Sequence, residues 1–283
     1  MFKNGLIFFF ALIMSGLMNA QANLLNAKKV DQIGVKNEQQ IAADNDGPIP
    51  YGYVDDRDVL WSKVVWEKID LNQKINLPYY FPIDTTNMSS NRRSLFDTLM
   101  KGMKQGKIKE AYSDSFFTSK ITQGEIDSRM TSVREENGYK DIVRLQTQDV
   151  EGYMIKGIWY FDKRQGELKY RLLALAPMGK DVQTVGTDLE DEELFELFWV
   201  FFPSTRNVLH DAKVFNPKNA SHPISFDHLL NSRRFSGVIV REENVYGNRK
   251  ISDYVRGNSL FQLLEAGKIK EDIRNREMDM WNY

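Results

Sequence analysis

The sequence predicts an α+β fold with a mostly antiparallel sheet flanked by helices, preceded by a cleaved signal peptide and a flexible leader. Residues 152–162 and 167–177 are rich in aromatic and apolar residues and are joined by a short polar connection, which predicts a β-hairpin. Helical patterns lie on both sides of this hairpin in the sequence and dominate 251–281. Paired strands with helices outside them are typical of an α+β domain.

An apolar run near the N-terminus predicts export. A lysine precedes the apolar residues 6–18, and the small residue Ala20 follows them, which is the layout of a signal peptide over residues 1–20. A helix needs about 20 apolar residues to cross a bilayer, so a retained anchor is the weaker alternative. We expect cleavage after Ala20, a flexible polar leader over 21–50 and a single α+β domain over 51–283.

The composition argues against several kinds of site and partner. The chain has no cysteine, so it can form neither a disulfide nor a thiolate metal site, and it cannot carry a lipid on an N-terminal cysteine. It has 38 Lys and Arg against 39 Asp and Glu, and this balance argues against nucleic acid as a partner. We therefore expect a periplasmic chain that protein partners hold at the membrane.

A wide apolar stripe predicts a helix over 58–70. Asp58 is a suitable residue to cap it, and polar side chains gather along one edge of the predicted helix. The acidic run 55–58 is interpreted as capping, with a cation site as the weaker alternative. Two prolines then favour extended or turn backbone over 77–82.

Two further helices are predicted before the hairpin. Residues 92–105 carry apolar side chains at every fourth position, and Gly106 is placed to end that helix. Thr122 and Glu125 match a capping box, which predicts the start of a short helix.

The sheet is predicted to continue beyond the hairpin. The second hairpin strand becomes wholly apolar over 173–176, so we expect it to lie centrally in the sheet. Residues 194–202 predict another buried strand, and Pro203 begins a helix after it. A further short strand is predicted at 238–240.

Three helices are predicted at the C-terminal end, over 251–255, 260–266 and 269–281. Glycine has low helix propensity and favours helix ends, so Gly257 and Gly267 are predicted to separate them. These helices would flank the sheet.

No catalytic or cofactor motif is recognisable. His210, His222 and His228 lack the close spacing of a metal-binding helix motif, so we expect no metal. The sequence has neither a glycine-rich phosphate loop nor a Gly-x-Ser-x-Gly motif, so we expect no cofactor and name no catalytic residue. The acidic run 188–193 is interpreted as a solvated surface. A periplasmic hydrolase acting on envelope polymers stays an alternative, because folding alone can bring two carboxylates together.

Aromatic residues near the start of the predicted domain form a candidate protein interface. They are Trp61, Trp66, Tyr79, Tyr80 and Phe81. Aromatic side chains often carry most of the binding energy of a protein contact. The alternative is that Trp61 or Trp66 belongs to the hydrophobic core. We favour a combination in which Trp66 is buried with Ile69 while the turn at 78–82 reaches a neighbour.

Several segments resemble one protein family. They include YVDDRDVLWSKVVW at 53–66, IWYFD at 158–162, FWVFFP at 198–203 and REMDMW at 276–281. In order and spread they resemble the GldN family, also called PorN, of gliding motility and type IX secretion. The resemblance covers 51–283, whereas the leader lies outside it.

The resemblance implies a non-enzymatic periplasmic subunit. Such a subunit assembles into rings with an outer-membrane lipoprotein, GldK or PorK, and contacts the periplasmic motor protein GldM or PorM. It would therefore be associated with the outer membrane through a partner. The resemblance implies no catalytic or cofactor residue.

Overall fold

The computed structural model describes residues 47–83, 92–136, 139–183, 194–216 and 224–281. The chain divides into two compact units, of which Met1–Gly47 with Asp84–Arg92 lies almost entirely outside the described residues. The predicted signal peptide, most of the leader, the acidic run 188–193 and His222 also lie outside them. The fold is that of the second unit, Pro48–Ile83 with Arg93–Tyr283.

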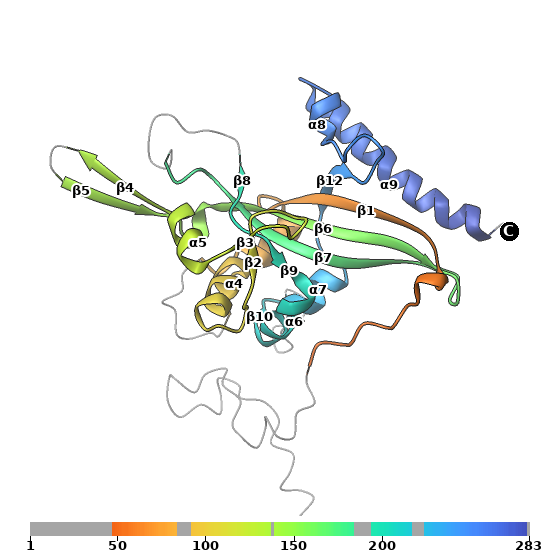
Figure 1. The fold of residues 1–283 in the computed structure, drawn as a ribbon, viewed down its shortest axis with the longest axis horizontal. Coiled ribbons are helices and arrows are strands. Elements are labelled where there is room, and N and C mark those ends of the chain that lie inside the picture. Colours follow the sequence, from red (N-terminus) through yellow and green to blue (C-terminus); the bar gives the residue numbers. More distant parts are fainter. Residues whose placement is uncertain (1–46, 84–91, 137–138, 184–193, 217–223, 282–283) are drawn as a thin grey trace, which may run out of the picture. The chain divides into compact units, whose positions relative to one another are not determined.

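An antiparallel sheet forms the centre of this unit. Its strands lie in the order β12-β1-β6-β7-β8, and β9 pairs with β7 beside β8. They are β1 (Val59–Asp70), β6 (Val150–Asp162), β7 (Glu167–Gly179), β8 (Phe195–Glu196), β9 (Val200–Phe201) and β12 (Gly237–Glu242). Figure 1 shows β1, β6 and β7 running side by side for most of their length. The predicted α+β class is confirmed.

The helix predicted over 58–70 is wrong. These residues form β1, which pairs with β6 on one side and β12 on the other. Its apolar stripe is wide because β1 buries side chains on both faces, with Val65 and Trp66 in different hydrophobic clusters. A strand buried on both faces has no polar face, so its pattern resembles that of a buried helix. Asp58 caps no helix, and a single 3-10 turn, Asp56–Asp58, is capped by Asp55 instead.

The predicted hairpin is confirmed as β6 and β7. Gly166 ends its turn with a φ of 63°, a conformation that glycine adopts without strain. The second half of β7 pairs with β6 on one edge and with β8 and β9 on the other, so this apolar part is central as predicted. The strand predicted over 194–202 is two short strands, and Trp199 between them pairs with Tyr112.

Helices and short strand pairs surround the sheet, and the hairpin of residues 131–136 and 139–144 projects away from it (Figure 1). Ser94 caps α4 (Leu95–Lys104), and Gly106 follows it with a φ of 68°, close to the prediction for 92–105. Thr122 and Glu125 form the predicted capping box of α5 (Gln123–Arg129). The remaining short elements are α3 (Leu77–Tyr80), α6 (Phe202–Asp211), α7 (Phe226–Asn231), β2 (Ala111–Tyr112), β3 (Lys120–Ile121), β4 (Thr131–Glu136), β5 (Tyr139–Arg144), β10 (Lys213–Val214), β11 (Ile224–Ser225) and the 3-10 turns Lys74–Asn76 and Thr147–Asp149.

Two predictions that rested on helix-breaking residues are wrong. Residues 77–80 form the one-turn helix α3, because Pro78 lies in its first turn, where no N–H is needed. At the C-terminal end, α8 (Ile251–Tyr254) is separate from α9, but Ser259–Trp281 is one helix of 23 residues. Gly267 does not break α9, since one internal glycine costs only about 1 kcal/mol and packing of the helix outweighs that cost.

The buried apolar side chains of the described residues form three clusters. The largest joins α4, α6 and α7 to the sheet, and α9 packs on β12 and β1 through Ala266, Ile269 and Ile273. The third lies around Trp66 and Trp199 beneath the segment between β2 and β3. In Figure 1, α4, α6 and α7 lie together, while α8 and α9 lie beside β12. Among the described residues, no helix is both long and apolar enough to cross a membrane.

Candidate protein-binding site

An extended segment that precedes β1 lies against the domain. We call residues 49–53 the arm. Side chains from α6, β7 and the β6–β7 turn donate hydrogen bonds to its backbone carbonyls. The bonds run from Arg206 Nη2 to Ile49 O at 2.7 Å, from Arg171 Nη2 to Gly52 O at 3.0 Å and from Arg164 Nη2 to Tyr53 O at 2.7 Å. Three arginines therefore hold the arm by its backbone.

Tyr51 is the anchor of the arm. Its hydroxyl donates a hydrogen bond of 2.8 Å to Asn231 Oδ1 on α7. Its ring contacts two guanidinium groups, with the Cζ atoms of Arg171 and Arg206 at 4.7 and 4.2 Å from the ring centroid. Burial raises the pKa of the Tyr51 hydroxyl above its usual value, and the nearby Arg206 charge opposes this rise. The ring thus combines cation–π contacts with a directed hydrogen bond.

A buried ion pair supports this site. Arg206 Nε and Nη2 donate to the two carboxylate oxygens of Asp227 at 2.7 and 3.0 Å. Arg206 is 8% exposed and Asp227 4% exposed. The hydrogen bond to Asp227 raises the pKa of Arg206 above its ordinary value, so this guanidinium stays charged. Asn231 donates a further hydrogen bond to Asp227 Oδ1 within α7, while the Arg206–Asp227 pair itself joins α6 to α7.

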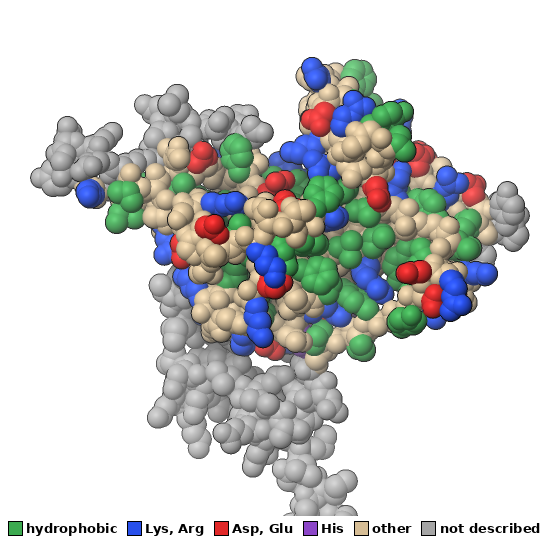
Figure 2. All heavy atoms as spheres, viewed as in Figure 1, with side chains coloured by type: hydrophobic (Ala, Val, Ile, Leu, Met, Phe, Trp, Pro, Cys, Tyr) green, Lys and Arg blue, Asp and Glu red, His purple; other side chains and the backbone are tan. Residues whose placement is uncertain are grey.

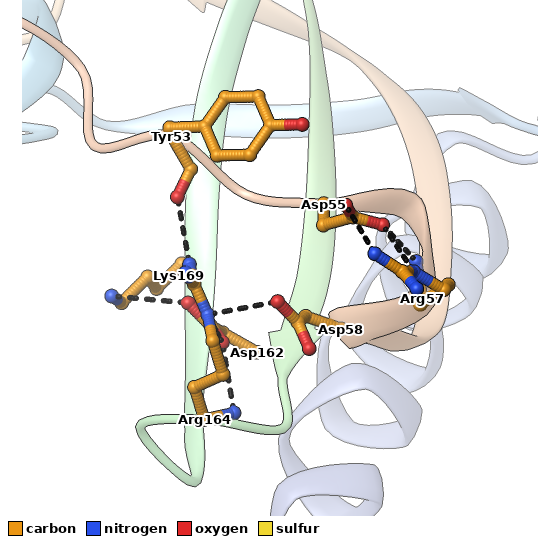
Figure 3. Close-up of polar contacts among 7 residues, drawn as sticks. All are labelled: Tyr53, Asp55, Arg57, Asp58, Asp162, Arg164 and Lys169. Atoms are coloured by element: carbon orange, nitrogen blue, oxygen red, sulfur yellow. Dashed lines mark hydrogen bonds and ion pairs between the residues drawn. The ribbon is translucent and has the colours of Figure 1, made fainter.

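A second group of charges fixes the base of the arm. Arg164 Nε lies 3.0 Å from Asp58 Oδ2 and 3.5 Å from Asp162 Oδ1, and Lys169 Nζ lies 3.8 Å from Asp162 Oδ2. Figure 3 shows these groups together with the Tyr53 carbonyl that Arg164 contacts. The acidic run 55–58 therefore caps a turn and pairs with the hairpin end.

The arm and the helices enclose a cleft of about 520 Å³. We call its side-chain wall the arginine groove, defined as Arg164, Arg171, Arg206, Asp227 and Asn231. His210 and His228 also line the cleft. Within the described parts of the chain, no cluster of three or more His, Asp or Glu side chains could hold a metal ion. The chemistry of the groove suits an extended peptide, whose carbonyls accept from guanidinium groups.

The five aromatic residues of the predicted interface do not lie on one surface. Trp66 and Tyr79 are 3% and 0% exposed, and they donate to Ser115 Oγ and Arg234 O. Trp61 packs beside α9, whereas Trp66 is not in the cluster of Ile69. Tyr80 is partly buried, and Phe81 is 49% exposed. The interface role of the turn at 78–82 stays a prediction. Of its three aromatic side chains, Phe81 is the exposed one.

The start of α9 carries exposed apolar side chains that sequence reasoning assigned to a sheet-covering helix. Leu260, Phe261, Leu263 and Leu264 are each more than half exposed. Figure 2 shows apolar side chains at the surface in the region of α8 and α9. In the sequence, these four apolar residues span a wider arc of the helix than one buried face requires. That pattern could have indicated that some of them are exposed. Exposed apolar patches of this kind often mark protein contacts.

A comparison with protein families identifies the family of the chain. The sequence model of the gliding motility associated protein GldN matches residues 54–282. The chain belongs to the GldN family. GldN proteins are components of the gliding motility and type IX secretion machinery. No curated protein matches the chain. The GldN match contains every residue of the arginine groove and begins just after the arm.

Replacing Tyr51 with Ala should release the arm without unfolding the domain. The change removes the hydrogen bond to Asn231 and both cation–π contacts, whereas residues 49–53 belong to no strand or helix. We expect cleavage within 49–54 by a protease of broad specificity to accelerate at least about tenfold, with a shift in melting temperature of less than about 3 °C.

Tyr53→Ala is the matched control, because the Tyr53 side chain is 78% exposed. It should leave the rate of cleavage in the arm unchanged. Equal acceleration in both variants would contradict the anchoring role of Tyr51.

Proposed function

We propose that this GldN-family chain is a non-enzymatic structural subunit of the type IX secretion and gliding motility machinery, located in the periplasm. It assembles in several copies into rings with an outer-membrane lipoprotein of the GldK/PorK kind. It also contacts a periplasmic motor protein of the GldM/PorM kind. The observation that carries this proposal is the family match over 54–282.

Two features of the fold support a role in protein binding. The start of α9 exposes four large apolar side chains, and the arginine groove holds an extended peptide segment. The cleft does not support the hydrolase alternative. Its buried carboxylates, Asp162 and Asp227, are both ion-paired with basic side chains. A catalytic acid in a glycoside hydrolase needs a raised pKa, which a neighbouring arginine opposes.

Purification of the tagged chain from detergent-treated envelopes tests the proposal. We expect the lipoprotein and the motor protein to co-purify, and ring-shaped particles to be visible by electron microscopy. A single-copy chain with neither partner would overturn it.

The exposed start of α9 provides a more local test. Replacing Leu260 and Leu264 together with Asn should weaken assembly by at least about tenfold, because apolar anchors at a contact often cost about 2 kcal/mol each when removed. The melting temperature should stay within about 2 °C, since both side chains are exposed. Yield of assembled particles and thermal unfolding measure the two effects.

Ile75→Asn is the control, because Ile75 is also exposed, at 54%, but lies in a 3-10 turn before α3. It should assemble like the unmodified chain. Normal assembly of the α9 variant would remove this surface from the proposed contacts.

A further inference from the structure

We propose that the arginine groove is an exchange site, which in the assembled protein takes the arm of a second copy of this chain. The inference rests on the proposed assembly of several copies. In the single chain the groove is filled by the arm of the same molecule. In the assembly, each copy would supply its arm to one neighbour and receive an arm from the other.

The arm and the groove are separable parts of the molecule. The contacts of the arm join residues far apart in sequence, from 111 positions for Arg164 with Tyr53 to 180 positions for Tyr51 with Asn231. The arm contributes to no strand or helix, so its removal breaks no backbone ladder. The domain matched by the family model contains the groove but not the arm. The groove therefore belongs to the folded domain, and the arm is a covalently linked peptide segment that binds to it.

The recognition does not depend on which copy supplies the arm. Guanidinium groups bind the backbone carbonyls of Ile49, Gly52 and Tyr53, and Tyr51 is the residue of the arm that is partly buried while the others are exposed. Pro48 and Pro50 restrict the backbone, so little further entropy is lost when the arm binds in extended form. Exchange between copies preserves every one of these contacts. Its free-energy change is consequently small, as in other cases of domain swapping.

Assembly would shift the equilibrium between the arm bound within one chain and the exchanged arm towards exchange. A neighbour held in a ring presents its groove at a high effective concentration, so the arm need not find it by free diffusion. A closed ring also requires two different complementary surfaces on each subunit. The arm and the groove are such a pair, because one carries carbonyls and Tyr51 while the other carries arginines. These two arguments favour a second copy as the occupant over an unrelated peptide.

Site-specific crosslinking tests the exchange, and the absence of cysteine makes every introduced thiol unique. Tyr53 and Gln165 are both exposed, and Arg164, next to Gln165, contacts the Tyr53 carbonyl. One chain carries Tyr53→Cys and a second, differently tagged chain carries Gln165→Cys. The two are produced together, isolated as assembled particles and treated with a bismaleimide. A covalent dimer that contains both tags is expected, because each chain alone has only one thiol.

Two controls make the result specific to the groove. Adding Tyr51→Ala to the chain with Tyr53→Cys should lower the yield of the mixed dimer at least about tenfold, since the anchor is lost. Replacing the acceptor with Val245→Cys, which is 91% exposed and lies outside the cleft, should give no comparable dimer.

The outcomes separate this inference from the proposed function. A double variant, Tyr53→Cys with Gln165→Cys, reports crosslinks within one chain. If particles assemble and only these internal crosslinks form, exchange is refuted and the assembly stands. If the chain never associates with a second copy, both the exchange and the ring fail.

Discussion

Replacing Arg206 with Ala should lower the free energy of unfolding by about 3–5 kcal/mol, the cost of leaving a buried charge without its partner. Asp227 is 4% exposed and receives two hydrogen bonds from Arg206, at 2.7 and 3.0 Å. Among the described residues, Asn231 is the side-chain donor that the Asp227 carboxylate keeps after the substitution. Urea unfolding, with the slope compared between variants, measures the loss.

Arg164→Ala is the matched control for this prediction. Arg164 also holds a carbonyl of the arm and pairs with carboxylates, but its side chain is 46% exposed. Its removal should cost less, about 1 kcal/mol, because the guanidinium is partly solvated and Asp162 keeps Lys169 and the hydrogen bond from the backbone N–H of residue 164. A second variant, Arg206→Met with Asp227→Leu, should recover most of the stability, since it removes both buried charges. Equal losses for Arg206→Ala and Arg164→Ala would show that the buried pair is no more important than the exposed one.

Replacing Gly157 with Ala should destabilise the sheet by about 3 kcal/mol and lower the melting temperature by about 10 °C. A Cβ on Gly157 would lie 2.1 Å from the Tyr170 hydroxyl oxygen and 2.2 Å from its Cζ. The ring of Tyr170 cannot move freely, because it packs on Trp159 and on the guanidinium of Arg233. The register of β6 and β7 also shifts next to Gly157, so the clash falls on an irregular part of the ladder.

Two comparisons identify the cause of that loss. Gly267→Ala, in the interior of α9 with no heavy atom within 4 Å of the added Cβ, should stabilise the chain by about 1 kcal/mol. Adding Gly157→Ala to a Tyr170→Ala background should cost little further stability, because the ring that causes the clash is absent. An undiminished cost in that background would mean that the backbone of β6, and not Tyr170, demands glycine. Thermal and urea unfolding of the four variants provide the measurement.

Local chemistry made several parts of the fold predictable. The capping box of Thr122 and Glu125 and the turn at Gly166 depend on residues within a few positions of each other. The hairpin of β6 and β7 was predictable for the same reason, since its strands are adjacent in sequence. The candidate site was not predictable. Arg206 meets Asp227 and the arm only because α6, α7 and β7 come together, and no spacing in the sequence records that.

By itself, the sequence determined the α+β class, the hairpin, the helices α4, α5 and α6 and membership of the GldN family. Those features depend on local propensity and on the order of recognisable segments. The tertiary structure alone decided that 59–70 is a strand, because strands from distant parts of the chain bury both of its faces. It alone kept α9 continuous through Gly267, where packing on β12 outweighs a weak local preference. It also placed Trp66 and Tyr79 in the core and left the start of α9 exposed, because burial depends on which surfaces meet.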